Sequence, residues 1–301
     1  MPDPAIPHRE HPAAPARRMV TVWPVNQLPA RLQRADRYVP GSTAHPGKML
    51  PALARHVITA YTQPGDLVLD PMCGIGTSLI EAAHLGRHAV GVDTEPRWIT
   101  LARANAAHAA TQGATGTIRL AQGDARHLHR LLPPDLAGQV RLLLTSPPYG
   151  PATHGQVHAD RAHGVRKREY TYGPSPANLA RAALPALTAG FADILTAARP
   201  YLHPDATVAV SVRPYRLAGD LIDLPGAILT AAQSAGYQRA DRAAALLTGF
   251  HGSRLVGRTT FFALHNIRAA RAAGIPLHAT AHEDVLLLRP GPMGRVSDTS
   301  G

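Results

Sequence analysis

The chain has 301 residues, and 31 lysines and arginines against 20 aspartates and glutamates give it a formal net charge of +11. Its single cysteine, Cys73, excludes an internal disulfide and any metal site with several cysteine ligands. No apolar run approaches the ~20 residues that cross a bilayer. The composition therefore predicts a soluble, cytoplasmic protein without a bound metal, and its basic charge favours a nucleic-acid partner.

The two ends of the chain differ in pattern from its middle. Residues 1–20 are rich in Pro and Ala and lack periodicity, which predicts a disordered tail and no secretory signal. Residues 21–290 are interpreted as a single domain, and residues 291–301 as a flexible tail. A short edge strand is expected near 20–23, and apolar residues at helical spacing predict a helix over Leu50–Tyr61.

From residue 67 onward, predicted strands alternate with helices. The predicted strands are Leu67–Asp70, Ala89–Asp93, Thr117–Ala121, Arg141–Thr145, Thr207–Val212, Phe261–Leu264 and Asp284–Leu288. The predicted helices are Thr77–Leu85, Glu95–Ala110, Ala177–Ala198 and Asp220–Ala235. This alternation predicts an α/β fold with a doubly wound, mostly parallel sheet. Two stretches fit it poorly and are interpreted as insertions, near 151–176 and near 238–281; the second contains a helix-like segment, Ile267–Ala273.

Acidic residues mark three successive strand ends, where ligands bind in an open α/β sheet. Asp70 ends the first strand and opens a turn in which Gly74 and Gly76 allow the backbone to approach a ligand closely. Asp93 ends the second strand, where a carboxylate can accept both ribose hydroxyls, and Asp124 follows the third, where it can bind an adenine amine. Each aspartate alone is more often a turn or helix-cap residue. Together they favour a nucleoside-bearing, positively charged cofactor over a pyrophosphate.

The tetrapeptide Ser146-Pro147-Pro148-Tyr149, after the fourth strand, is the most specific pattern in the chain. Two consecutive prolines force an extended, rigid turn and remove two backbone donors. An exocyclic amine on a nucleobase is a poor nucleophile because its lone pair is delocalised into the ring. The Ser146 hydroxyl and the Pro147 carbonyl can accept its N–H groups while Tyr149 stacks on the base. The tetrapeptide thus predicts catalysis by positioning and electrostatics, without a metal.

These motifs resemble those of the amino-directed DNA methyltransferases, the N4-cytosine and N6-adenine group, in their gamma-like order. His45-Pro46-Gly47-Lys48 resembles the family's HPxK-like entry, residues 85–93 its second strand, and residues 282–288 its last strand. The resemblance implies a Rossmann-like methyltransferase fold with seven strands and helices on both faces, and S-adenosyl-L-methionine (SAM) as methyl donor. The cofactor-binding residues that we expect are His45, Lys48, Asp70, Pro71, Cys73, Gly74, Gly76, Thr77, Asp93 and Asp124.

The sequence departs from the family in three places. Cys73 replaces a small residue, which should be tolerated. Gly150 follows the tyrosine, as it commonly does in tRNA guanine-N2 methyltransferases. A large extra domain for target recognition is lacking, so recognition is expected from the two insertions, which are basic. The candidate nucleic-acid-binding residues are Arg161, Arg166, Lys167, Arg168, Arg254 and Arg258.

Three functions remain open at this point. The preferred function is methylation of DNA on an exocyclic amine. Cytosine N4 is the expected target because serine is usual in the tetrapeptide of N4-cytosine enzymes, and adenine N6 is the alternative target in DNA. The second is methylation of a guanine or adenine amine in RNA, which Gly150 favours. The third, a protein that binds SAM or nucleic acid without catalysis, is opposed by the intact catalytic tetrapeptide.

Overall fold

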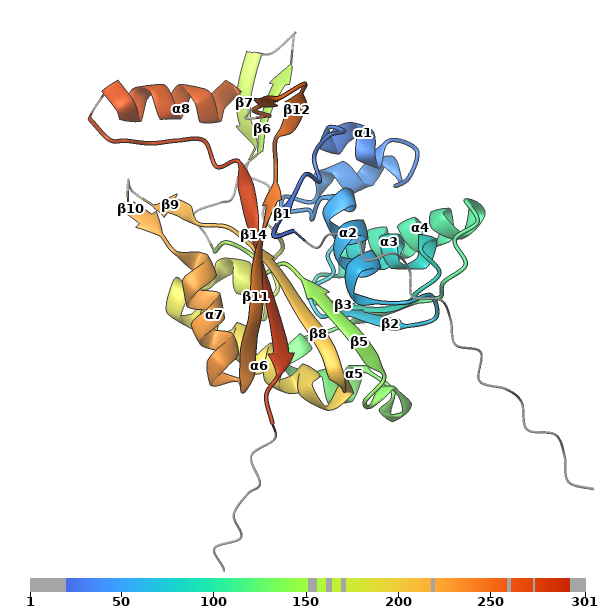
Figure 1. Ribbon diagram of the computed structural model, residues 1–301. Helices are drawn as coiled ribbons and strands as arrows, with labels where there is room; N and C mark the ends of the chain where they lie inside the picture. Colours follow the sequence, from blue (N-terminus) through green and yellow to red (C-terminus); the bar gives the residue numbers. More distant parts are fainter. Residues whose placement is uncertain are drawn as a thin grey trace, which may run out of the picture.

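The computed structural model describes residues 20–150, 156–160, 164–168, 172–217, 220–258, 261–272 and 274–292. An eight-stranded sheet lies at its centre, in the order β1-β11-β14-β8-β5-β2-β3-β4, with helices on both faces (Figure 1). Its strands are β1 (Val22–Trp23), β2 (Leu67–Asp70), β3 (His88–Asp93), β4 (Ile118–Gln122), β5 (Val140–Thr145), β8 (Leu202–Val212), β11 (Tyr237–Leu246) and β14 (His282–Pro290). β14 runs antiparallel to both of its neighbours, and the other pairs are parallel.

The described residues contain eight α-helices, six of which pack on the sheet in two groups. They are α1 (Ala30–Arg34), α2 (Pro51–Tyr61), α3 (Thr77–His84), α4 (Pro96–Thr111), α5 (Leu128–Leu131), α6 (Leu184–Ala198), α7 (Leu224–Ser234) and α8 (Phe261–Ala272). In β5, Leu142 and Leu144 face the core formed with α2, α3 and α4, whereas Leu143 faces the core formed with α5, α6 and α7. Because both faces of this central strand are buried, its middle residues, Leu142–Leu144, form a continuous apolar run.

Three hairpins complete the elements. They are β6 (Gln156–Asp160) with β7 (Gly164–Arg168), β9 (Tyr215–Leu217) with β10 (Asp220–Ile222), and β12 (Gly249–His251) with β13 (Arg254–Val256). In Figure 1 they lie with α8 beyond the edge at which the parallel strands end. In the part of the chain that the structure describes, no helix has the length and apolarity needed to cross a membrane.

The structure confirms the α/β fold and its mostly parallel sheet, with one strand placed differently. The predicted strand Phe261–Leu264 is wrong, since these residues begin α8; a short apolar run does not distinguish a strand from a helix. The additional strand is β11, within the stretch interpreted as an insertion. Its pattern was hidden because a register shift between Arg239 and Asp241 interrupts the period of two and charged residues occupy its exposed positions.

Two predicted helices begin later than expected. The helix predicted over Ala177–Ala198 begins at Leu184, after the 3-10 turn Leu179–Arg181, because Ala183 is extended and Pro185 occupies the first turn. The helix predicted from Asp220 begins at Leu224, where the Asp223 side chain accepts a hydrogen bond from the Gly226 amide. The eighth strand is β1, the expected edge strand, which pairs with β11.

Candidate functional site

The turn after β2 has the backbone geometry that its glycines permit. Gly74 and Gly76 have φ values of 52° and 82°, which side chains rarely adopt. A Cβ at Gly74 would lie 2.7 Å from Nε2 of His45, so the turn and the His45 ring are in direct contact. The Gly74 amide donates to Asp93 Oδ2 at 2.8 Å, which ties the turn to the end of β3. A side chain at Gly74 would therefore collide with His45, and one at Gly76 would strain the backbone.

Asp93 lies at the edge of this turn and lines the main cavity. Its two oxygens accept hydrogen bonds from the backbone amides of Gly74 and Glu95. Burial raises its pKa to about 6, although these amides oppose the shift. Asp93 is thus a fixed carboxylate facing a cavity, as the ribose-binding interpretation requires.

Asp70 has a different environment. It is buried and accepts hydrogen bonds from the Thr145 and Ser78 hydroxyls and the Met72 amide, which tie the β2 turn to the end of β5 and to α3. Burial raises its pKa to about 6. Its oxygens are therefore engaged with the protein, and they hold the turn in place. Pro71, Cys73 and Thr77 belong to the same turn, all buried, with Pro71 lining the main cavity and the other two a smaller one beside it.

Asp124 lies after β4, as expected, and lines the cavity. Its carboxylate accepts hydrogen bonds from the Arg126 guanidinium, the shortest at 2.6 Å, and from the Arg126 amide. Burial raises the pKa of Asp124, but the hydrogen bonds from Arg126 outweigh it, so that the pKa is lowered overall. The aspartate also caps the 3-10 turn Ala125–His127. Asp124 thus lines the cavity with its carboxylate already paired with Arg126.

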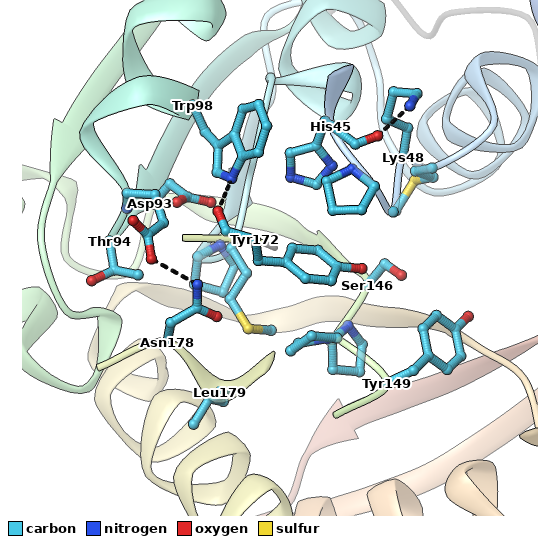
Figure 2. A pocket seen from close by; sticks show the side chains of 18 of the residues that line it. His45, Lys48, Asp93, Thr94, Trp98, Ser146, Tyr149, Tyr172, Asn178 and Leu179 are labelled. Atoms are coloured by element: carbon cyan, nitrogen blue, oxygen red, sulfur yellow. Dashed lines mark hydrogen bonds between the residues drawn. The ribbon is translucent and has the colours of Figure 1, made fainter. Parts of the chain in front are cut away.

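His45 and Lys48, which precede α2 in the chain, line the cavity (Figure 2). The buried His45 ring contacts the rings of Trp98 and Tyr172, with centroids 4.5 and 5.4 Å away. Burial lowers its pKa to about 3, so the ring is neutral. Among the described residues its Nδ1 has no hydrogen-bond partner. Lys48 donates to the carbonyls of Thr43 and His45, and burial lowers its pKa to about 8.

The tetrapeptide Ser146–Tyr149 follows β5 and lines the same cavity, which has a volume of about 370 Å³. Tyr149 is half-buried between two neighbours: the Arg213 guanidinium lies 5.5 Å from its ring centroid, and the Tyr215 ring packs edge-on at 6.4 Å. Such contacts restrict the tilt of the Tyr149 ring. Gly150 has a φ of 74°, so the residue after the tyrosine turns the chain back in a conformation that glycine favours.

Neither Glu95 nor the segment 172–178, to which it is bonded, was identified from the sequence as part of the site. Glu95 is 1% exposed, and its carboxylate accepts hydrogen bonds from the Ser175 amide at 3.0 Å and the Asn178 side chain at 2.7 Å. Trp98 Nε1 donates to the Tyr172 carbonyl at 2.6 Å (Figure 2). Residues 172–178 therefore form a wall of the cavity. The only sequence signal was a second acid two residues after Asp93, which is equally typical of a helix start.

The candidate nucleic-acid-binding residues fall in three places. Arg161 lies outside the described residues, and Arg166, Lys167 and Arg168 lie on β7. Arg254 is exposed on β13. Arg258 lines the cavity and donates to the carbonyls of Asn26 and Gln27, so it ties the segment after β13 to the N-terminal part of the domain.

The residues present fit SAM. The cavity joins a fixed carboxylate at the end of β3, a second carboxylate at the end of β4 and a buried neutral histidine. Hydroxyl and amine groups of a nucleoside are complementary to such acceptors. In the described part of the chain, no group of three or more His, Cys, Asp or Glu side chains is arranged to hold a metal ion.

Comparisons with known proteins identify part of the chain. Residues 41–163 match the RMKL-like methyltransferase domain family. The tRNA (guanine(10)-N2)-dimethyltransferase of Methanocaldococcus jannaschii is 36% identical over 110 residues, which are 36% of this chain and 31% of that protein. The enzyme of the same name from Methanothermobacter thermautotrophicus is 37% identical over 107 residues, 35% and 29% of the two chains. The matched part thus spans less than a third of the length of these relatives.

One similar solved structure is TrmN from Thermus thermophilus, with a TM-score of 0.48 and 19% identity. The match covers 86% of this chain and 53% of that one. Another is the precorrin-6Y C5,15-methyltransferase of Geobacter metallireducens, with a TM-score of 0.46, 10% identity and coverage of 84% and 93%. The strand order β4-β3-β2-β5-β8 is that of a doubly wound, nucleotide-binding sheet. Together with the family match, it shows a Rossmann-like methyltransferase domain whose cofactor is SAM.

Proposed function

We propose that this chain transfers a methyl group from SAM to the exocyclic N2 amine of a guanine in tRNA. The observation that carries the proposal is that the Ser146–Tyr149 turn and the Asp93 carboxylate line one cavity. When bound, SAM supplies an electrophilic methyl group on a sulfonium. An amine held at Ser146 would then lie in the same enclosure as the donor.

The roles of the residues follow from their chemistry. Asp93, held by two backbone amides, accepts the ribose hydroxyls of the cofactor. The Ser146 hydroxyl and the Pro147 carbonyl accept the two N–H groups of the target amine, and Tyr149 stacks on the base with Arg213 beside its ring. Positioning of this kind removes part of the entropic barrier without a covalent intermediate. Glu95 positions residues 172–178 as a wall that excludes water.

The choice of tRNA guanine rests on three observations. The two relatives named above are tRNA guanine-N2 enzymes, and residues 41–163 match an RMKL-like domain. Gly150 follows the tyrosine, as in the guanine-N2 motif. These observations support the RNA alternative over our first expectation, DNA cytosine N4, and its adenine-N6 variant. The proposal includes one catalytic domain over residues 21–290, with nucleic-acid contacts from the basic residues of both insertions.

Methyl transfer tests the proposal directly. Tritiated SAM should label unmodified tRNA and leave double-stranded DNA unlabelled, and nucleoside mass spectrometry should identify N2-methylguanosine. Ser146→Ala and Tyr149→Ala should each lower kcat at least about tenfold and leave the Kd for SAM within about twofold. Ser234→Ala, on the exposed side of α7, is the matched control and should change neither. Label found only in DNA, or a product such as N4-methylcytosine, would overturn the proposal.

A further inference from the structure

A second pair of charged side chains lines the cavity next to Tyr149. Arg213 follows the last residue of β8, and Glu283 is the second residue of β14. Val212 and Asp284 are partners in the register of these antiparallel strands, so Arg213 and Glu283 are the next residue on each strand. They lie at the edge where β5 ends and the Ser146 turn begins, since β5 and β14 flank β8.

Glu283 is held in position by a serine on the neighbouring strand β8. Ser211, which is fully buried on β8, donates its hydroxyl hydrogen to Glu283 Oε2 at 2.5 Å. A carboxylate that is anchored through one oxygen can accept hydrogen bonds at a fixed place with the other. Glu283 and Ser146 line the same cavity of about 370 Å³, so a nucleobase held in it can contact both.

The acceptor chemistry of a carboxylate selects among the bases that carry an exocyclic amine. In guanine, the ring atom next to the amine on the Watson–Crick edge is N1, which carries a hydrogen. In cytosine and adenine, the corresponding atoms, N3 and N1, are unprotonated acceptors. A carboxylate beside the amine would therefore accept a hydrogen bond from guanine, whereas with cytosine or adenine it would face a lone pair and remain unpaired.

We infer that Glu283 recognises the target base as guanine by accepting the N1–H hydrogen bond, with Ser211 as its positioning residue and Arg213 as the donor to guanine O6. The inference rests on the function proposed above and names how its substrate base is selected. Arg213 is suited to this part because it lines the same cavity as Glu283 and Tyr149, with its guanidinium over the Tyr149 ring at 5.5 Å from the ring centroid. A carboxylate that accepts from N1–H and a guanidinium that donates to the adjacent O6 match neighbouring donor and acceptor atoms of guanine.

The substrate that tests this inference is an RNA in which 2-aminopurine replaces the guanine that is methylated. This base keeps the N2 amine but has no hydrogen on N1 and no O6. The wild-type protein should methylate it at least about 100-fold less efficiently, in kcat/KM, than the guanine RNA. Glu283→Gln places an amide donor opposite the unprotonated N1, so the preference for guanine should shrink at least about tenfold. Ser211→Ala should change the preference in the same direction by a smaller factor.

Binding gives a second readout that does not depend on turnover. The fluorescence of 2-aminopurine riboside 5′-monophosphate reports its binding to the protein with S-adenosylhomocysteine, and guanosine 5′-monophosphate is the competitor. The guanine nucleotide should displace it from the wild-type protein at least about tenfold more effectively than from Glu283→Gln. SAM affinity of the variant should stay within about twofold, which shows that the cofactor site is folded. Asp241→Asn, an exposed carboxylate on β11, is the matched control and should behave as wild type.

The outcomes separate this inference from the proposed function. If the wild-type product is N2-methylguanosine and Glu283→Gln keeps the full preference for guanine in both assays, the role of Glu283 is wrong and the proposed function stands. Failure of guanosine monophosphate to displace the fluorescent nucleotide from the wild-type protein also overturns the role of Glu283. If the wild-type product is a methylated cytosine or adenine, or if no RNA is methylated, both are wrong.

Discussion

At the scale of single residues, the site depends on carboxylates that burial has made less acidic. Asp93 and Asp70 both have a pKa raised to about 6, but they act differently. Asp70 is enclosed by hydroxyls and an amide of the protein, whereas Asp93 lines the cavity. A cofactor that donates hydrogen bonds to Asp93 favours its ionised form, so the two carboxylates predict different effects of pH on binding.

We expect SAM affinity to fall as the pH drops through 6. Ribose hydroxyls bind the ionised Asp93 more strongly than the neutral acid, so the Kd should be constant above pH 7 and rise toward pH 5. Asp93→Asn should weaken binding at pH 7.5 by about 10- to 100-fold and should remove the pH step, because the amide does not titrate. Calorimetric titrations at pH 5, 6 and 7.5 measure both effects. A step that persists in Asp93→Asn would assign it to Asp70 instead.

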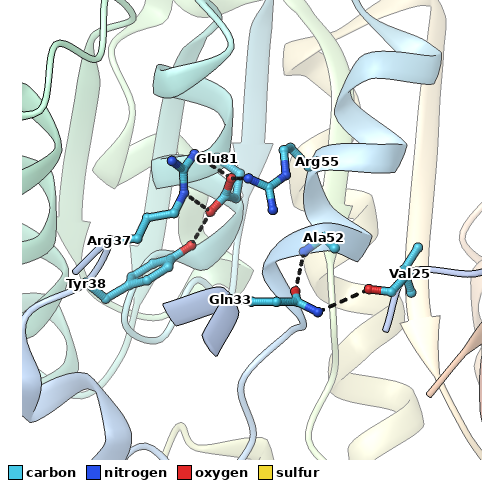
Figure 3. Close-up of polar contacts among 7 residues, drawn as sticks. All are labelled: Val25, Gln33, Arg37, Tyr38, Ala52, Arg55 and Glu81. Atoms are coloured by element: carbon cyan, nitrogen blue, oxygen red, sulfur yellow. Dashed lines mark hydrogen bonds and ion pairs between the residues drawn. The ribbon is translucent and has the colours of Figure 1, made fainter. Parts of the chain in front are cut away.

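At the scale of elements, a buried carboxylate on α3 holds the N-terminal segment against the domain. Glu81 is fully buried and accepts two hydrogen bonds of 2.7 Å from the Arg37 guanidinium and one of 2.7 Å from the Tyr38 hydroxyl (Figure 3). Arg55, on α2, lies 3.5 Å away. Gln33, on α1, bonds to the Val25 carbonyl and the Ala52 amide. These contacts place the residues that lead into His45 beside the cavity.

Removal of this carboxylate should destabilise the protein strongly. Glu81→Ala leaves Arg37 and Tyr38 without their buried partner, so the free energy of unfolding should fall by about 3–5 kcal/mol. Arg55→Ala removes only a longer, partly exposed ion pair and should cost less than about 1 kcal/mol. Urea denaturation, with the midpoint compared at an unchanged m-value, measures both. A Glu81→Ala midpoint close to that of the wild type would mean that the cluster contributes little to stability.

How much the sequence predicts depends on how local each contact is. The strands before Asp70, Asp93 and Ser146 are short apolar runs, and each functional residue follows its strand directly, so pattern alone located them. Glu95 and Asn178 are 83 residues apart, and their hydrogen bond has no local signal. Arg258, which stays a predicted nucleic-acid contact, also bonds to a carbonyl 232 residues away, and no local pattern indicates that bond. Such non-local pairs form only when the sheet brings distant loops to one edge.

At the scale of the whole molecule, the net charge of +11 and the placement of the hairpins predict how the substrate is held. The cavity opens at the edge where the parallel strands end, and the hairpins lie beyond that edge (Figure 1). Arg254 is exposed on β13 among these elements, whereas Arg119 is exposed near the start of β4, at the opposite edge. An RNA that reaches the cavity would pass Arg254 and leave Arg119 untouched.

The affinity for tRNA should therefore fall with salt concentration, and this dependence should come from basic residues at the edge that carries Arg254. With three phosphate contacts, the Kd for tRNA should rise on the order of 20-fold between 50 and 200 mM salt, because bound counterions are released from the RNA. The Kd for SAM should change by less than about twofold. Arg254→Ala should lower the slope of log Kd against log salt by about one, and Arg119→Ala should leave it unchanged. Filter binding over this range measures the slopes, and equal slopes for the two variants would place the RNA elsewhere on the surface.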